Sequence, residues 1–172
     1  ASLINPRQTS AITYLQSPLN AQDDGTQFGA GPVAGAPLLE CRVQLAVLSK
    51  PADGPDVRAG HVTDVVQNRF TLLAFAPQPA LLQALQRYAE ALLAKGIPVA
   101  VLPVLAALDG VDNSLEAVID AEGHLTAMYG ALPGAVYVLR PDGHVLGRWQ
   151  GGRHAPGDVA AAVRHAIDKA LA

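Results

Sequence analysis

The chain has 172 residues, of which 50% are apolar and 16% are charged. This composition supports a single globular domain with an extension and excludes a chain that is disordered throughout. A formal net charge of −3 without a basic cluster argues against nucleic acid and against an anionic membrane as partners. No apolar run approaches the ~18 to 20 residues that span a bilayer, and no signal peptide is recognisable, so a cytoplasmic location is expected.

Residues 1–37 contain four prolines and four glycines without a sustained hydrophobic period, which predicts a linker or extended N-terminal arm. The folded domain is expected to span residues 38–172. Residues 38–48 alternate apolar and polar side chains, which predicts a half-buried strand, and residues 49–60 are rich in Pro, Gly and Asp, which predicts a loop.

Residues 70–76 form a compact apolar run that predicts a central strand covered on both faces. Residues 79–95 carry apolar side chains at helical spacing, begin with Pro79 and are followed by Gly96, which predicts a helix. Residues 97–102 predict a second buried strand. A strand, a helix and a strand of this length indicate a right-handed parallel crossover, and therefore an α/β fold.

The rest of the chain is expected to hold one or two helical turns at residues 124–129, a hairpin of residues 135–140 and 144–149, and a final helix over residues 157–171. Residues 103–122 have no clear pattern. The order of the elements is that of a thioredoxin fold, with a mixed central sheet flanked by helices.

In a thioredoxin fold the active cysteines lie where the first central strand meets its long helix, because the helix dipole favours the thiolate there. Here that junction reads Ala76-Pro77-Gln78-Pro79-Ala80 and holds no cysteine. The single cysteine, Cys41, excludes an internal disulfide and a dithiol centre, and core packing is its expected role. A peroxiredoxin-like enzyme that acts through Cys41 is kept as a third hypothesis.

No catalytic, cofactor-binding or metal-ligating residue is assigned. The five histidines (His61, His124, His144, His154 and His165) lack metal-ligand spacing. Residues 29–35 are rich in glycine but depart from a dinucleotide fingerprint, and Ser17 and Ser114 lie outside any nucleophile elbow. The cluster Arg148, Trp149, Arg153 and His154 is interpreted as a solvated loop with one half-buried tryptophan, rather than as an anion or partner contact.

Three blocks of sequence resemble a known family: Phe70-Thr71-Leu72-Leu73, Tyr129-Gly130-Ala131-Leu132-Pro133-Gly134, and Val138-Leu139-Arg140-Pro141-Asp142-Gly143-His144-Val145. Together they are similar to the C-terminal domain of FAD-dependent aromatic-ring hydroxylases, the group of phenol hydroxylase, 3-(3-hydroxyphenyl)propionate hydroxylase and polyketide hydroxylases. Residues 14–19 and 31–35 resemble the connector that precedes that domain. The resemblance covers roughly residues 14–171.

The resemblance implies a thioredoxin-like domain that has lost its cysteine pair, with a structural, interface or lid role in a flavin-dependent monooxygenase. FAD and NAD(P)H would belong to the full-length parent and not to this chain, and the implied partner is an N-terminal flavin domain of the same polypeptide. A homodimer and the cis or trans state of Pro133 are left open. The alternative is a free-standing thioredoxin-like binding module that uses a groove near Pro77 and Pro133.

Overall fold

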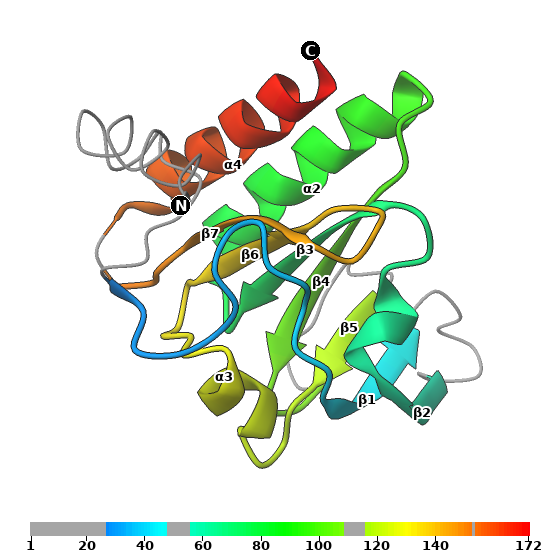
Figure 1. The fold of residues 1–172 in the computed structure, drawn as a ribbon, viewed down its shortest axis with the longest axis vertical. Coiled ribbons are helices and arrows are strands. Elements are labelled where there is room, and N and C mark those ends of the chain that lie inside the picture. Colours follow the sequence, from blue (N-terminus) through cyan, green and yellow to red (C-terminus); the bar gives the residue numbers. More distant parts are fainter. Residues whose placement is uncertain (1–26, 48–55, 109–115, 153) are drawn as a thin grey trace, which may run out of the picture.

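The computed structural model describes residues 27–47, 56–108, 116–152 and 154–172. These residues form a seven-stranded mixed sheet, in the order β2-β1-β5-β4-β3-β6-β7, and three α-helices (Figure 1). The strands are β1 (Arg42–Val47), β2 (Asp56–His61), β3 (Phe70–Phe75), β4 (Val99–Leu105), β5 (Glu116–Ile119), β6 (Val136–Leu139) and β7 (Val145–Trp149). The helices are α2 (Pro79–Ala94), α3 (His124–Met128) and α4 (Pro156–Leu171), and a 3-10 helix, η3 (Val62–Val65), follows β2.

The parallel unit β3–α2–β4 forms the centre of the sheet. β3 pairs with β4 from Phe70 opposite Val99 to Phe75 opposite Val104, and its other neighbour is β6. α2 begins with Pro79, whose missing N–H has no role in a first helical turn, and ends before Gly96, which has a φ of +82°. The predicted α/β class and the predicted central strand are therefore confirmed.

The alternating side chains of β3 divide the core into two layers. Leu72 and Ala74 face α2 and α4, which lie side by side over one face of the sheet (Figure 1). Leu73 and Phe75 face the opposite layer, which also contains side chains from η3 and α3. All four side chains are at most 1% exposed, so β3 is covered on both faces, as its continuous apolar sequence predicts.

The predicted hairpin and the two later helices are also present. β6 and β7 pair antiparallel, with an irregularity in register at Val138 and Leu139, around a turn in which Gly143 has a φ of +87°. α4 buries Val163 and Ile167 against the sheet and α2. In the described ranges no helix combines the length and the apolar character needed to cross a bilayer.

Several predicted boundaries were wrong, and the strand expected over residues 38–48 begins only at Arg42. Residues 56–60, expected in a loop, belong to β2, whose exposed edge position leaves it without the apolar alternation that marks a strand. β4 extends three residues beyond Leu102, through Pro103. A proline is tolerated there because its nitrogen faces β5, which pairs with β4 only from Val104 onward.

Candidate functional site

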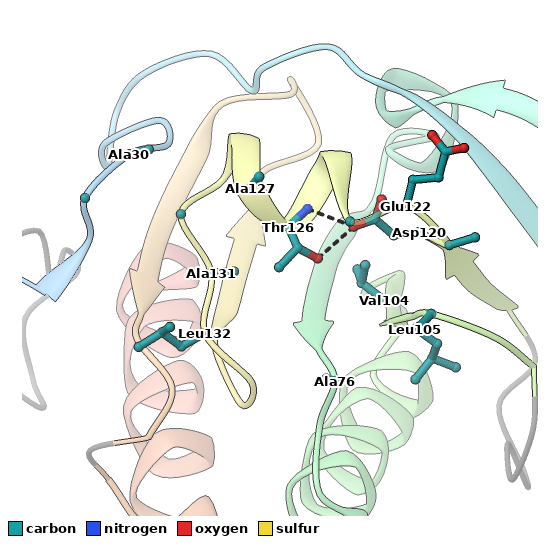
Figure 2. A pocket seen from close by; sticks show the side chains of 15 residues that line it. Ala30, Ala76, Val104, Leu105, Asp120, Glu122, Thr126, Ala127, Ala131 and Leu132 are labelled. Atoms are coloured by element: carbon teal, nitrogen blue, oxygen red, sulfur yellow. Dashed lines mark hydrogen bonds between the residues drawn. The ribbon is translucent and has the colours of Figure 1, made fainter.

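A cleft of about 720 Å³ lies where the carboxyl ends of β3, β4 and β5 meet (Figure 2). Ala76 follows β3, Leu105 ends β4 and Asp120 follows β5. α3 and the segment Gly29–Ala30 form the other walls. Ligands of open α/β sheets commonly bind beyond the carboxyl ends of parallel strands, which makes this cleft the first candidate for a binding site.

The most buried charge at the cleft is already engaged in the fold. The Asp120 carboxylate accepts hydrogen bonds from the N–H groups of Leu125 (3.1 Å) and Thr126 (2.9 Å) and from the Thr126 hydroxyl (2.7 Å), as Figure 2 shows for Thr126. It therefore satisfies amides at the start of α3 that have no partner within the helix. Glu122, also on the rim, pairs with His124 at 3.4 Å, and both side chains are well exposed.

The remaining lining is small and apolar. Nine of the fifteen lining residues are alanine or glycine, and Val104, Leu105 and Leu132 supply most of the larger apolar surface. The lining contains no cysteine, serine, histidine, lysine or arginine. The cleft can thus accept an apolar group, but it offers no cation for an anionic ligand, and its one hydroxyl, that of Thr126, donates to Asp120.

A second pocket, of about 280 Å³, lies at the junction of β3 and α2. It is lined by Ala76, Gln78, Pro133, Gly151 and His154, among others, so the structure does bring the β3–α2 junction and Pro133 together. None of its lining residues is a cysteine. The described residues contain no cis peptide bond, so the peptide bond before Pro133 is trans.

Backbone strain is present at this junction. Ala76 has a φ of 42°, in the left-handed region that residues with a Cβ rarely adopt. Its N–H donates to the Val104 carbonyl oxygen at 2.9 Å, and on its other side Gly134 N–H donates to the Phe75 carbonyl oxygen at 2.7 Å. These bonds to β4 and to the loop before β6 hold Ala76 in this conformation. Ala76 lines both pockets.

Cys41 lies just before β1 and lines neither of these two pockets. It is half-buried against the core layer that contains Phe75, and its Sγ lies 3.4 Å from the Arg42 carbonyl oxygen. Burial, together with the negative charges of Asp120 and Glu40, raises the pKa of the thiol. These surroundings disfavour the thiolate and are unlike those of a reactive cysteine.

The remaining candidates from the sequence are the histidines, the two serines and the cluster at residues 148–154. Among the described residues, no group of three or more His, Cys, Asp or Glu side chains is arranged to hold a metal ion. Ser17 and Ser114 lie outside the described residues. The interpretation of residues 148–154 as a solvated loop was wrong for the first two: Arg148 and Trp149 belong to β7 and are 3% and 1% exposed. Arg153 lies outside the described residues.

The glycine-rich segment at residues 29–35 does not fit a dinucleotide. No helix follows it, and a Cβ at Gly31 would come within 2.2 Å of the Tyr137 hydroxyl and 2.5 Å of the Tyr129 carbonyl oxygen. The space that a pyrophosphate would need is therefore filled by the domain itself. The described residues offer no flavin site of this kind, and no chemical step is assigned to a flavin bound here.

Residues 27–39, which we call the docked arm, pack onto the domain. The sequence pattern did not predict this packing. The Tyr129 hydroxyl donates to the Leu39 carbonyl oxygen at 2.6 Å and accepts from the Leu39 N–H at 3.0 Å. The Gln150 amide, 2% exposed, donates to the Gln27 and Gly130 carbonyl oxygens at 3.1 and 2.8 Å. Ordered packing thus begins well before residue 38.

One sequence signal for this packing exists. Phe28 is the one phenylalanine of the first 37 residues, and it stands in a segment of polar and small residues. Its ring makes an edge-on contact with Tyr137 at 5.4 Å between centroids. A phenylalanine in a presumed linker indicates an anchor, because an aromatic side chain gains much when it is buried.

The comparisons with solved structures show the thioredoxin-like fold. Plasmodium yoelii thioredoxin peroxidase I matches 79% of this chain and 89% of its own, with a TM-score of 0.61 and 14% identity. Enterococcus faecalis AhpC matches 78% of this chain and 90% of its own, with a TM-score of 0.60 and 13% identity. At such identities the likeness concerns the fold alone. The predicted fold class is confirmed.

A third solved structure is the flavin-dependent monooxygenase PieE in complex with FAD and substrate. It is 25% identical over 79% of this chain, with a TM-score of 0.49, and the match takes up 21% of the PieE chain. No protein-family model matches this chain, and no curated protein does so either.

Proposed function

We propose that this chain is a redox-inactive, thioredoxin-like C-terminal domain of a FAD-dependent aromatic-ring monooxygenase, in which it has a structural, interface or lid role. The observation that carries the proposal is that the sequence blocks that resemble this family contact one another in the fold. Gly31 of the connector block packs against Tyr129 and Tyr137, and Gly35 N–H donates to the Val145 carbonyl oxygen at 2.8 Å. Blocks that lie about a hundred residues apart in sequence thus form one contact region.

This contact region supports an interface role in particular. Leu38 N–H donates to the Gly143 carbonyl oxygen at 2.9 Å, and Val145 N–H donates to the Ala36 carbonyl oxygen at 2.8 Å. The chain is therefore bound to this domain from Gln27 onward and not only from its first strand. An entry segment held in this way shortens the free length of chain before this domain, which favours an interface or lid role.

In this proposal FAD and NAD(P)H bind to the preceding domain of the same polypeptide. The flavin there would supply the oxygen-activating chemistry. The residues of this chain contribute packing surfaces, because neither pocket offers a cysteine, a serine or a cradle for phosphate, and the Asp120 carboxylate beside the Thr126 hydroxyl is already bound to the start of α3. The aromatic substrate would be recognised in the flavin domain.

An immunoblot of the source cells, with an antibody raised against this chain, tests the proposal. The expected band is several-fold heavier than 17.8 kDa, the mass of the chain itself. The heavy polypeptide, once immunoprecipitated, should carry flavin absorbance, whereas the isolated chain should show none. A single band at 17.8 kDa would overturn the proposal.

A free-standing binding module is the second candidate function, and the two pockets favour it. The groove at Ala76, Gln78 and Pro133 matches the place where such a module would hold a peptide or a small molecule. A band at 17.8 kDa would make this candidate the leading one. Nuclear magnetic resonance of the labelled chain with a fragment library would then check it, with shifts expected at the amides of Gln78 and Gly134.

A further inference from the structure

The cleft at the carboxyl ends of β3, β4 and β5 combines an apolar inner surface with a negatively charged rim. Val104 and Ala131, which line it, are 3% and 8% exposed and therefore lie deep. The charged side chains of the lining are those of Asp120 and Glu122. The volume of about 720 Å³ is within the range of small-molecule sites, which runs from roughly 300 to 1,000 Å³.

The Asp120 carboxylate keeps an acceptor position for a ligand. An ionised carboxylate can accept about four hydrogen bonds, and the described residues supply three. Oδ2 accepts both bonds from Thr126, whereas Oδ1 accepts the single bond from the Leu125 N–H at 3.1 Å. The open position is therefore on Oδ1. Because the three bonds already hold the carboxylate in place, a ligand would not have to order it.

Glu122 adds a second carboxylate, which the fold does not use. It lies 3.4 Å from His124, but the two side chains are 78% and 74% exposed, and such a surface pair contributes little. Arg42 and His124 line a neighbouring pocket of about 250 Å³ that shares residues 120–122 with the cleft, and neither lines the cleft itself. Among the described residues, the lining of the cleft thus carries two negative charges and no positive one.

The docked arm forms one wall of this cleft. Gly29 and Ala30 line it, and Ala30 is labelled in Figure 2. The Ala30 carbonyl oxygen accepts a hydrogen bond from Arg148 at 3.2 Å. Gly130, also in the lining, packs so closely on the arm that a Cβ there would lie 2.7 Å from the Ala30 carbonyl oxygen. The cleft is therefore complete only while the arm is docked.

We propose that this cleft binds a small primary amine in its ammonium form, and that full affinity requires the docked arm. The apolar part of the ligand packs against Val104 and Ala131. Its ammonium group lies at the rim beside Asp120 and Glu122, where its three N–H donors match carboxylate oxygens. This inference does not depend on the proposed function, which assigns no ligand to this cleft.

Nuclear magnetic resonance titration of the labelled 172-residue chain tests the choice of ligand. The probes are benzylamine, benzyl alcohol and benzoate, which have similar size and are positive, neutral and negative at neutral pH. Benzylamine should bind with a Kd of about 1 mM, about fivefold tighter than benzyl alcohol, and benzoate should not bind. The amides of Thr126 and Leu132 should shift. Benzyl alcohol or benzoate that binds as tightly as benzylamine would overturn the inference.

Glu122→Gln tests the charge of the rim. It should weaken benzylamine about threefold and leave benzyl alcohol unchanged, because only the amine uses the carboxylate. Glu90→Gln, the same change at an exposed position of α2, is the matched control and should affect neither ligand. An unchanged affinity for benzylamine in Glu122→Gln, or an equal loss for both ligands, would overturn the inference, because the rim charge would then not be recognised.

Gly130→Ala tests the wall formed by the docked arm. The new Cβ would overlap the Ala30 backbone and displace the arm, so benzylamine should bind about fivefold more weakly. Gly123→Ala is the matched control: its φ of +74° resembles the +61° of Gly130, but nothing lies within 4 Å of its Cβ position. Its affinity for benzylamine should stay within about twofold of the wild type.

Circular dichroism checks that each variant is folded. Equal losses of affinity in Gly130→Ala and Gly123→Ala would contradict the docked arm as a wall of the site. Amide shifts at Leu132 that change with protein concentration, in the absence of any probe, would assign the cleft to a second copy of the chain and would also overturn the inference.

Discussion

The guanidinium of Arg148 lies 4.5 Å from the centre of the Phe28 ring, and it joins β7 to the docked arm. The same side chain donates to the Ala30 carbonyl oxygen at 3.2 Å and approaches the Tyr137 hydroxyl at 3.4 Å. A cation over an aromatic face is attractive, and more so when the pair is shielded from water, as it is here at 3% exposure of Arg148. This arginine is therefore a main anchor of the arm.

Arg148→Met should loosen the docked arm, although methionine fills most of the volume that the buried arginine side chain occupies. We expect a loss of about 2 kcal/mol in the free energy of unfolding, since a charged hydrogen bond and a shielded cation–π contact are both removed. The Gly35 amide donates a hydrogen bond to the Val145 carbonyl oxygen, and its hydrogen exchange should be faster in this variant than in the wild type. Arg140→Met, at a half-exposed ion pair with Asp142, is the control and should change neither quantity much.

Gly31→Ala tests the close approach of the arm to the domain. The new Cβ would lie 2.2 Å from the Tyr137 hydroxyl oxygen, and the φ of Gly31 is +98°. Overlap and backbone strain together should cost about 2 to 3 kcal/mol in the free energy of unfolding, measured by urea denaturation.

Gly29→Ala is the matched control for this substitution, because nothing lies within 4 Å of its Cβ position. It should change the free energy of unfolding by less than about 0.5 kcal/mol. Equal effects of the two substitutions would mean that Gly31 does not touch Tyr137 in solution.

The contrast between the centre of the fold and its periphery explains what could be predicted from sequence. β3, α2 and β4 carry strong hydrophobic patterns because both faces of the sheet bury them, so residues 70–76 and 79–95 could be recognised. β2 has no such pattern because it lies exposed at an edge. The docked arm is held by backbone hydrogen bonds, by side chains of the domain such as Arg148 and Tyr129, and by the close approach of Gly31. None of these leaves a periodic signal in the arm itself.

The candidate site was less predictable than the fold for a related reason. Its cleft is made by alanines and glycines from several segments that only the fold brings together. Sequence reasoning did identify the β3–α2 junction as the place to examine, and Ala76 is strained there. It could not show the strain, because nothing in the sequence around an alanine reveals a positive φ.

Ala76→Gly should stabilise the protein, against the usual direction of an alanine-to-glycine change. The left-handed conformation costs alanine about 1 to 2 kcal/mol and costs glycine little, while glycine adds about 0.4 to 1 kcal/mol of unfolded-state entropy. A net gain of about 0.5 to 1 kcal/mol is expected in urea denaturation. Ala91→Gly, at an exposed interior position of α2, should instead cost about 1 kcal/mol.

Glu40 should make stability depend on pH in the acid range. Burial raises its pKa, but hydrogen bonds from the Thr63 hydroxyl, from the Thr63 N–H and from the Cys41 N–H outweigh this and hold the pKa below its ordinary value. A pKa lowered by folding adds stability above the unfolded value, and that stability is lost as the pH falls through the folded value.

The stability advantage of the wild type over Glu40→Gln should therefore shrink as the pH falls from about 6 to about 3. Urea denaturation at several pH values measures the difference. Glu90→Gln, on the exposed side of α2, serves as the control substitution. A difference that stays constant across this range would show that the Glu40 carboxylate does not bind Thr63 in its charged form.

The reactivity of Cys41 distinguishes a structural thiol from the nucleophile of a peroxidase. Because burial and the charges of Asp120 and Glu40 raise its pKa, less thiolate is present at about pH 8 than in a free cysteine, and the thiolate is the reacting form. Alkylation by iodoacetamide should therefore be slower than that of N-acetylcysteine at the same pH, and it should accelerate as the pH rises. Hydrogen peroxide should not be turned over by the wild type or by Cys41→Ala. Peroxide turnover by the wild type that disappears in Cys41→Ala would restore the peroxidase hypothesis. Such turnover requires the Cys41 thiolate, so it would contradict the raised pKa of this thiol.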